Sequence, residues 1–338
     1  MGVKASPPLL VLAPMAEITD APFRQIAREH GADAVVTEMI SAAGLVRGNR
    51  RARMMLEHAE CERPLAVQLY GGDADEMAEA ARIVAHSAAK FGGFVEININ
   101  AGCPVPKVTK CGGGSALIRA PEKIAEMVVK MKAAAGGLPV SVKTRVGLRP
   151  GNVAIFDILQ AVEEAGASSI VVHGRYAVAG HGGPPDIPLL AETVARAKIP
   201  VIVNGGTNTP DDAVRIARET GAAGLMVGRA AIGKPFVFDG IKNKWKSSEV
   251  QEVREVQNSG NSEVLVVFTK HIGLIVSHYK SLMNKYPELI TDPEKFAVRA
   301  FVTHLFRYFT GVPGANNIRR NMNSCRNVGD IFRLLECC

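Results

Sequence analysis

The chain has 338 residues and a formal net charge of +7, and 47% of its residues are hydrophobic while 22% are charged. This length favours one large domain plus a smaller one, and no apolar run approaches the length of a membrane span. The six cysteines show no paired spacing, which argues against a disulfide framework and gives little support to a zinc site. We therefore expect a cytoplasmic protein that binds neither a membrane nor a metal.

Up to about residue 240 the chain repeats one unit, in which a short apolar run is followed by a turn and an amphipathic helical stretch. The runs are Leu9–Met15, Ala34–Met39, Leu65–Gly71, Phe94–Ile99, Pro139–Val146, Ser168–Gly174, Pro200–Gly205 and Gly224–Gly228. Their Val, Ile and Leu content indicates strands that are buried on both faces, as in a parallel sheet. Eight such α/β units over about 240 residues favour a TIM (β/α)8 barrel. A doubly wound open sheet is the alternative.

The repeating unit ends after Trp245. Residues 246–262 are polar, and from Val264 onward apolar residues recur at helical spacing. We therefore predict a TIM barrel at residues 1–243, a polar linker at 244–262 and an all-helical C-terminal domain at 263–338. From Ile241 onward the chain holds 14 Lys and Arg residues but only 9 Asp and Glu residues. This bias permits a polyanionic partner.

Polar and small residues follow the predicted strands at their C-terminal ends, which is where TIM barrels carry their active sites. In chain order they are Pro14, Met15 and Ala16; Gln68; Asn98, Asn100 and Cys103; Lys143, Thr144 and Arg145; His173, Gly174 and Arg175; Asn204, Gly205 and Gly206; and Gly228 and Arg229. Any one of them could be purely structural, since a buried Gln often satisfies only its neighbouring backbone. Barrel geometry brings all of them to one end, so together they predict a site.

The last two of these groups suit a phosphate. The segments 204–206 and 228–229 offer backbone N–H groups and one guanidinium. Lys143 could stabilise negative charge on a ring or share the phosphate, and Gln68 could bond to a ring edge. A phosphate and a flat polar ring in a barrel mouth suggest flavin mononucleotide (FMN). No GxGxxG motif follows the first strand, so a Rossmann-type dinucleotide is not indicated.

Cys103 stands on a turn directly after a buried strand, in the segment Asn-Ile-Asn-Ala-Gly-Cys-Pro at residues 98–104. Pro104 prevents the strand from simply continuing, because it fixes φ and removes a backbone donor. A thiol held in this way could act as a nucleophile, a metal ligand or a proton donor.

With these residues in place, the chain resembles the tRNA-dihydrouridine synthase family. The matching stretches are APMAEITDAPFR (13–24), VQLYGGD (67–73), INAGCPVPKVTKCGGGSALI (99–118), VKTRVG (142–147), VVHGR (171–175), PVIVNGG (200–206), GLMVGRAAIGKP (224–235) and, in the tail, THLFRYFTGVPGA (303–315). The Asn-x-Gly-Cys-Pro motif with its downstream Lys-x-x-x-Gly segment is the most specific of these matches.

The resemblance implies an FMN enzyme that uses NADPH or NADH to reduce selected uridines of tRNA to 5,6-dihydrouridine. Hydride would pass from N5 of FMN to C6 of the uracil, and Cys103 would protonate C5 as the general acid. The implied FMN contacts are Pro14, Met15, Ala16, Gln68, Lys143, His173, Asn204, Gly205, Gly206, Gly228 and Arg229. Asn100 would hold the uracil edge, and Lys107, Lys110 and Arg175 are implied substrate or RNA contacts. The helical domain would bind the tRNA body through phosphate contacts.

The chain departs from the family pattern at two places. Asn98 stands where many relatives have Asp, and Ala179 and His181 replace a Gln-x-Tyr pair. Two other functions remain open: an FMN barrel oxidoreductase that acts on a free pyrimidine, similar to dihydroorotate dehydrogenases, and a tRNA-binding protein without catalysis. The basic helical tail argues against the first alternative, and the intact Cys103, Lys143 and His173 argue against the second.

Overall fold

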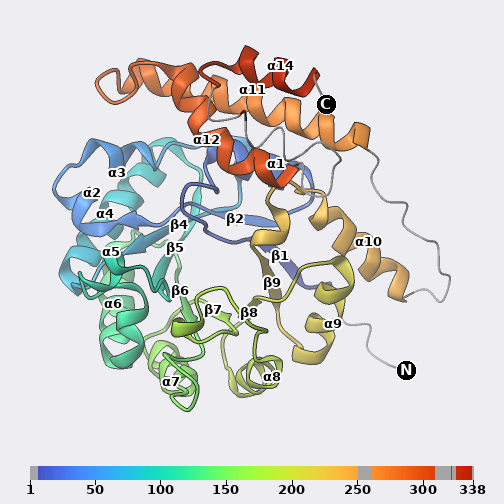
Figure 1. The fold of residues 1–338 in the computed structure, drawn as a ribbon. Coiled ribbons are helices and arrows are strands. Elements are labelled where there is room, and N and C mark those ends of the chain that lie inside the picture. Colours follow the sequence, from blue (N-terminus) through green and yellow to red (C-terminus); the bar gives the residue numbers. More distant parts are fainter. Residues whose placement is uncertain (1–6, 250–260, 309–320, 322–324, 337–338) are drawn as a thin grey trace.

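Nine parallel strands form the centre of the structure, a computed structural model that describes residues 7–249, 261–308, 321 and 325–336. They are β1 (Leu9–Leu12), β2 (Ala34–Val36), β3 (Ile40–Ser41), β4 (Leu65–Tyr70), β5 (Phe94–Ala101), β6 (Val140–Arg145), β7 (Ile170–His173), β8 (Val201–Asn204) and β9 (Gly224–Val227). Their order is β2-β1-β9-β8-β7-β6-β5-β4-β3, and an additional pairing of β2 with β4 closes the sheet into a barrel (Figure 1). The closed barrel confirms the predicted fold and excludes the open sheet.

Each of the eight predicted apolar runs corresponds to one strand of the barrel, although β5 continues through Ala101, two residues beyond the predicted run Phe94–Ile99. The ninth strand, β3, was not predicted, because its two residues are too short to give a periodic pattern. Ile40 and Ser41 pair with Leu69 and Tyr70 at the end of β4, so β3 extends the barrel wall there only locally.

Helices surround the barrel (Figure 1). They are α1 (Ala21–Glu29), α2 (Ala42–Val46), α3 (Arg50–Met54), α4 (Ala74–Phe91), α5 (Pro106–Thr109), α6 (Pro121–Ala134), α7 (Ile155–Glu164), α8 (Ile187–Arg196), α9 (Pro210–Thr220) and α10 (Val237–Glu249). Local sequence sets their ends. In α9, for example, the Thr209 side chain accepts a hydrogen bond from the N–H of Asp212, and Gly221 ends the helix in the left-handed region.

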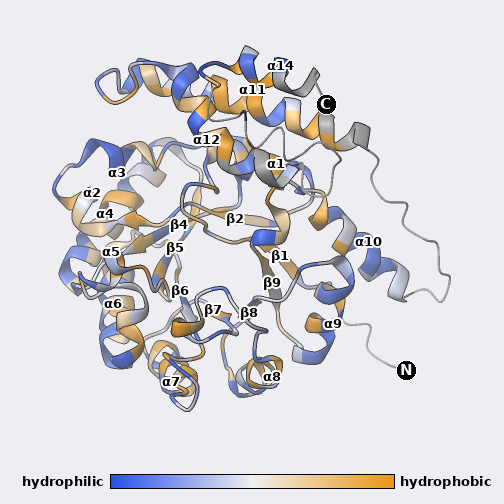
Figure 2. Cartoon of the chain, in the orientation of Figure 1, coloured by the Kyte–Doolittle hydropathy of each residue, from blue (hydrophilic) through white to orange (hydrophobic). Residues whose placement is uncertain are grey.

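Alternation along each strand divides the side chains between two environments. On β5, Ile97 and Ile99 point outward into the main core between strands and helices. The inward side of the barrel carries only a small apolar cluster of Val11, Ala13, Val36, Ala66, Val171 and Met226. Figure 2 shows the hydrophobic colour of β2, which contributes to that cluster. Polar residues of β4, β5, β6, β7 and β8 also face the barrel interior.

The C-terminal part of the described chain consists of α11 (Asn261–Lys285), α12 (Pro293–Tyr308) and α14 (Val328–Glu336). Phe268, Ile272 and Phe301 from this region share a buried cluster with Ile26 of α1. Ion pairs reinforce the contact with the barrel, including Lys270 with Glu29 at 2.7 Å. The helical region therefore packs on the α1 side of the barrel (Figure 1).

The predicted start of the linker at residue 244 is wrong, because α10 continues through residue 249. The reason is Trp245, which is buried in the main core and holds this part of the helix against the barrel. Residues 250–260 of the predicted linker lie outside the described part of the chain. Among the described helices, none combines the length and the apolar character that a membrane crossing requires.

Candidate active site

A cavity of about 520 Å³ opens at the C-terminal ends of the barrel strands. The predicted site residues that line it are Pro14, Met15, Ala16, Gln68, Asn100, Cys103, Lys143, His173, Arg175, Asn204, Gly205, Gly206, Gly228 and Arg229. The cavity is also lined by Arg145, which was predicted at a strand end but given no role, and by Met39, His181, Thr207 and Asn208, which were not among the predicted site residues. Of these, Arg145 carried a usable signal, since it follows Lys143 at the same strand end.

Two predicted contacts do not line the cavity. Lys107 lies on α5 and Lys110 directly after it, and both side chains are exposed to solvent. Asn98 is also absent from the cavity wall, because it lies one inward position below Asn100 on β5.

The ends of β8 and β9 form one side of the cavity. Gly205 and Gly206 have φ values of 107° and 84°, which favour glycine. A Cβ atom on Gly205 would lie 3.0 Å from both Arg175 Nη1 and His173 Cδ2, so a side chain there would crowd the site. The N–H groups of Gly206, Gly228 and Arg229 donate no hydrogen bond to any described residue. These donors therefore remain available to a ligand.

Lys143 crosses the floor of the cavity. Its Nζ donates to Asn204 Oδ1 at 3.0 Å, and Asn204 Nδ2 donates to the Met226 carbonyl at 2.7 Å. Burial, and then the charge of Arg145, lowers the pKa of Lys143 to about 7. This amine therefore changes its charge near neutral pH.

The tautomer of His173 follows from its neighbour. Arg175 Nη1 lies 3.2 Å from His173 Nε2, and a guanidinium can only donate, so Nε2 accepts. Burial, and then the charges of Lys143 and Arg145, hold the pKa of His173 well below its ordinary value. The ring is therefore neutral, with its proton on Nδ1. Arg175 is fixed in turn by donating to the carbonyls of Gly182 and Gly183.

The turn that carries Cys103 is anchored from both sides. Asn100 Oδ1 accepts hydrogen bonds from the N–H groups of Gly102 at 3.2 Å and Cys103 at 3.0 Å. Arg145 Nε donates to the Gly102 carbonyl at 2.9 Å. Local Asx bonding of this kind fixes a turn, so the partly exposed thiol occupies a defined place in the cavity wall.

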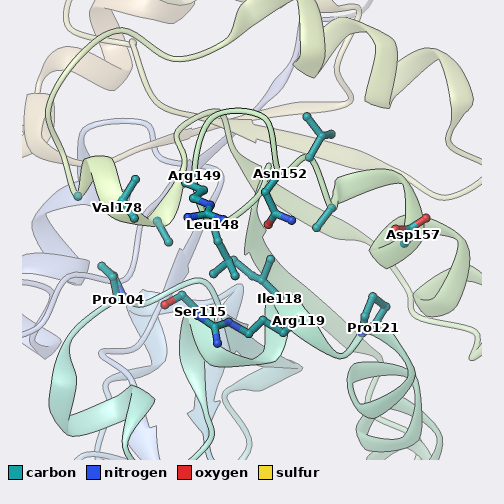
Figure 3. A pocket seen from close by; sticks show the side chains of 14 residues that line it. Pro104, Ser115, Ile118, Arg119, Pro121, Leu148, Arg149, Asn152, Asp157 and Val178 are labelled. Carbon is teal, nitrogen blue, oxygen red and sulfur yellow. The ribbon is translucent and has the colours of Figure 1, made fainter.

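A larger hollow of about 1080 Å³ lies beside this cavity and shares Pro104 with it. Figure 3 shows Leu148, Val178, Arg119 and Arg149 among its lining residues. Neither arginine forms an ion pair with a described residue. The convergent amine, thiol, imidazole and amide groups all lie in the smaller cavity, which we therefore take as the candidate active site.

A further polar cluster joins the barrel to the helical region. Single ligand atoms of Asp20, His271 and His304 lie within 4.8 Å of one another. His271 Nε2 and both ring nitrogens of His304 are buried and have no hydrogen-bond partner in the described structure. Such a group could hold a metal ion, so the expectation that the protein binds no metal stays a prediction.

A closed parallel barrel with a polar cavity at its C-terminal face defines the class of TIM-barrel enzymes. A family model described as dihydrouridine synthase matches residues 11–337. The chain belongs to the dihydrouridine synthase family, which confirms the resemblance seen in its motifs.

Individual relatives agree with this assignment. A tRNA-dihydrouridine synthase B of Pseudomonas syringae is 32% identical over 96% of this chain and 91% of its own length. One from Vibrio cholerae is 35% identical over 97% of this chain and 94% of its own length. Among solved structures, the old yellow enzyme of Trypanosoma cruzi has a TM-score of 0.51 at 10% identity, covering 70% of this chain and 88% of that one. This last likeness concerns the fold alone.

Proposed function

We propose that this protein is a tRNA-dihydrouridine synthase that reduces specific uridines of tRNA to 5,6-dihydrouridine, with FMN as cofactor and NADPH or NADH as reductant. The observation that carries the proposal is that Cys103, Lys143 and the backbone N–H donors that follow β8 and β9 line the same cavity. Membership of the family and the names of its relatives support the same reaction.

The cavity fits FMN in size and in donors. Its volume of about 520 Å³ lies within the range of about 300–1,000 Å³ that small-molecule sites occupy. The unpaired N–H groups of Gly206, Gly228 and Arg229, with the Arg229 guanidinium, suit a phosphate. When bound, FMN supplies the hydride for the reduction of the uracil ring.

The cavity residues would orient the ring of the cofactor. Lys143, when protonated, stabilises negative charge beside it. His173 offers its Nδ1–H as a neutral donor. Gln68 uses one Nε2 hydrogen for Asn98 and its Oε1 for Asn100, which leaves one N–H for a ring edge. Asn100 and Arg175 are the proposed contacts of the uracil.

Cys103 is the proposed general acid. Protonation of C5 requires a donor held near the ring, and the anchored turn supplies such a position in the cavity wall. A uridine in folded tRNA must leave its stack to reach this cavity. Exposed cations outside the cavity, including Lys107 and Lys110, and the basic C-terminal region are the proposed contacts of the tRNA backbone.

The purified protein should be yellow, and heat should release a flavin that chromatography identifies as FMN. Incubation with NADPH and tRNA from a strain without dihydrouridine should form dihydrouridine, which nucleoside mass spectrometry detects. Conversion of free uracil or orotate without RNA would favour the free-pyrimidine alternative. A colourless protein that still binds tRNA would contradict the enzyme proposed here.

A further inference from the structure

A continuous chain of hydrogen bonds runs through the barrel interior beneath the Cys103 turn. It crosses β4, β5 and β6 and ends in a carboxylate that lies far below the cavity wall. Strand register makes the chain possible, because Asn98 stands opposite both Gln68 and Ser141. The side chains of these three residues therefore point into the same layer of the barrel.

The upper half of this hydrogen-bond chain connects the Cys103 turn to β4. The Cys103 N–H donates to Asn100 Oδ1 at 3.0 Å, and Asn100 Nδ2 donates to Gln68 Oε1 at 2.8 Å. Gln68 Nε2 then donates to Asn98 Oδ1 at 2.8 Å. Two residues that line the cavity, Asn100 and Gln68, are thus oriented by the next amide below them.

The lower half connects Asn98 to a carboxylate. Asn98 Nδ2 donates to Ser141 Oγ at 2.7 Å, and Ser141 Oγ donates to Glu96 Oε1. Burial raises the pKa of the Glu96 carboxyl, and the hydrogen bond from Ser141 opposes that rise. Glu96 does not reach the cavity.

The groups at the two ends of the hydrogen-bond chain, the Cys103 N–H and the Glu96 carboxylate, fix the direction in which every hydrogen bond between them is donated. A backbone N–H can only donate, and an ionised carboxylate can only accept. Every amide between them therefore presents its oxygen toward Cys103 and its nitrogen toward Glu96. Reversing any one amide would place two donors or two acceptors face to face.

Solvent offers the three middle side chains of this hydrogen-bond chain no substitute partners, whereas the carboxylate of Glu96 at its lower end is partly exposed. Ser141 is 0% exposed, Gln68 1% and Asn98 3%. A broken link would leave a buried polar atom unpaired, and the amides above it would lose their fixed orientation.

We propose that Glu96 and Ser141 are positioning residues, which act through Asn98 to fix the amides of Gln68 and Asn100 and, with them, the Cys103 turn. The effect of these two residues on turnover rests on the proposed function, but their effect on the position of the Cys103 turn does not. Neither residue touches the cofactor or substrate cavity, so their effect on the site passes through the chain.

The test measures the turn directly. Alkylation of Cys103 by iodoacetamide is followed by peptide mass spectrometry, with the exposed Cys111 as an internal reference. Ser141→Ala and Glu96→Val each remove one link, and both should speed alkylation of Cys103 by about threefold or more. Glu96→Gln retains an acceptor oxygen and should stay near the wild-type rate. Cys111 should react equally in all proteins.

The double variant Glu96→Val/Ser141→Ala tests whether the two residues act through the same hydrogen-bond chain or independently of each other. If both residues act through the same chain, the double variant should behave like either single variant. In the reductase assay, kcat should fall by about tenfold or more in the single variants, because small misplacements of reacting groups are costly. KM for NADPH should not change.

Wild-type alkylation of Cys103 in folded Ser141→Ala protein would overturn the proposal, as would multiplicative effects in the double variant. If Ser141→Ala does not fold, Glu96→Val and Glu96→Gln provide the same comparison. If no protein reduces uridine but the alkylation pattern holds, the positioning role stands and the proposed function fails.

Discussion

Lys143 is a half-buried amine that hydrogen-bonds to a neutral amide and not to a carboxylate. Its pKa falls from 10.5 to about 7 because of burial and then Arg145. Between these two values the unfolded chain binds more protons than the folded one. The free energy of unfolding that is due to Lys143 therefore rises with pH over this window. An anion bound beside the amine would raise its pKa again, so protonation of Lys143 is coupled to occupancy of the cavity.

We therefore predict that FMN binding to the apoprotein at about pH 8 takes up protons, up to about one per site. Lys143 is mostly neutral at that pH in the empty cavity and becomes charged beside the cofactor. Titration calorimetry in two buffers of different ionisation enthalpy measures the uptake. Lys143→Met protein should show none. Equal uptake in both proteins would show that another group is responsible.

Cys103 allows a second test at the residue scale. Cys103→Ala should lower turnover by about 10²–10⁴-fold, the usual contribution of a general acid. Flavin content and the rate at which NADPH reduces the bound flavin should be unchanged, because the thiol is not among the proposed cofactor contacts. Cys111→Ala, in the same loop region but exposed, is the matched control. Full activity of Cys103→Ala protein would exclude the thiol as the proton donor.

At the scale of elements, the strand–turn–helix repeat was enough to predict the barrel, because parallel strands buried on both faces have a distinct composition. The location of the residues after each strand was also predictable, because barrel closure brings the C-terminal ends of all strands together. The interior chain below Cys103 was not predictable. It depends on register, which sets Asn98 between Gln68 and Ser141, and no local pattern encodes register. The burial of Trp245 in the main core likewise could not be predicted, because it depends on tertiary packing.

The turn after β8 can be tested as an element. Gly205→Ala should destabilise the protein by about 1–3 kcal/mol, because alanine at positive φ is strained and its Cβ would crowd His173 and Arg175. It should also weaken FMN binding. Thermal or urea unfolding of the apoprotein measures the first effect, and fluorescence titration measures the second.

Gly273→Ala is the control for this substitution. Gly273 is exposed on α11, and a Cβ there meets nothing within 4 Å. Alanine should stabilise this helix by about 0.5–1 kcal/mol. If both variants lose stability equally, the positive φ of Gly205 is not what constrains the turn.

At the scale of the whole molecule, the cavity and the helical region meet through one short segment after β1. Ile18 lines the cavity, and Asp20, two residues later, lies in the cluster with His271 of α11 and His304 of α12. A tRNA held by the helical region would therefore be held in fixed relation to the cavity. The hollow beside Pro104 extends the same face, and its two arginines have no ion-pair partners among the described residues.

We predict that Arg119 and Arg149 bind the phosphates of nucleotides next to the flipped uridine. Arg119→Gln/Arg149→Gln protein should bind tRNA more weakly, and the slope of log affinity against log salt should fall by about two. FMN content and NADPH-dependent flavin reduction should be unchanged, because neither arginine lines the smaller cavity. Filter binding over a salt series, with stopped-flow reduction of the flavin, makes both measurements.

The control variant removes two arginines elsewhere on the barrel. Arg196 on α8 and Arg215 on α9 are each paired with a glutamate of their own helix. Arg196→Gln/Arg215→Gln makes the same change in net charge, so a general loss of positive field would affect both double variants equally. A selective loss in the Arg119/Arg149 variant would place the RNA on this face. Equal losses would leave the hollow without a role in RNA binding, and the basic helical region would then account for the affinity.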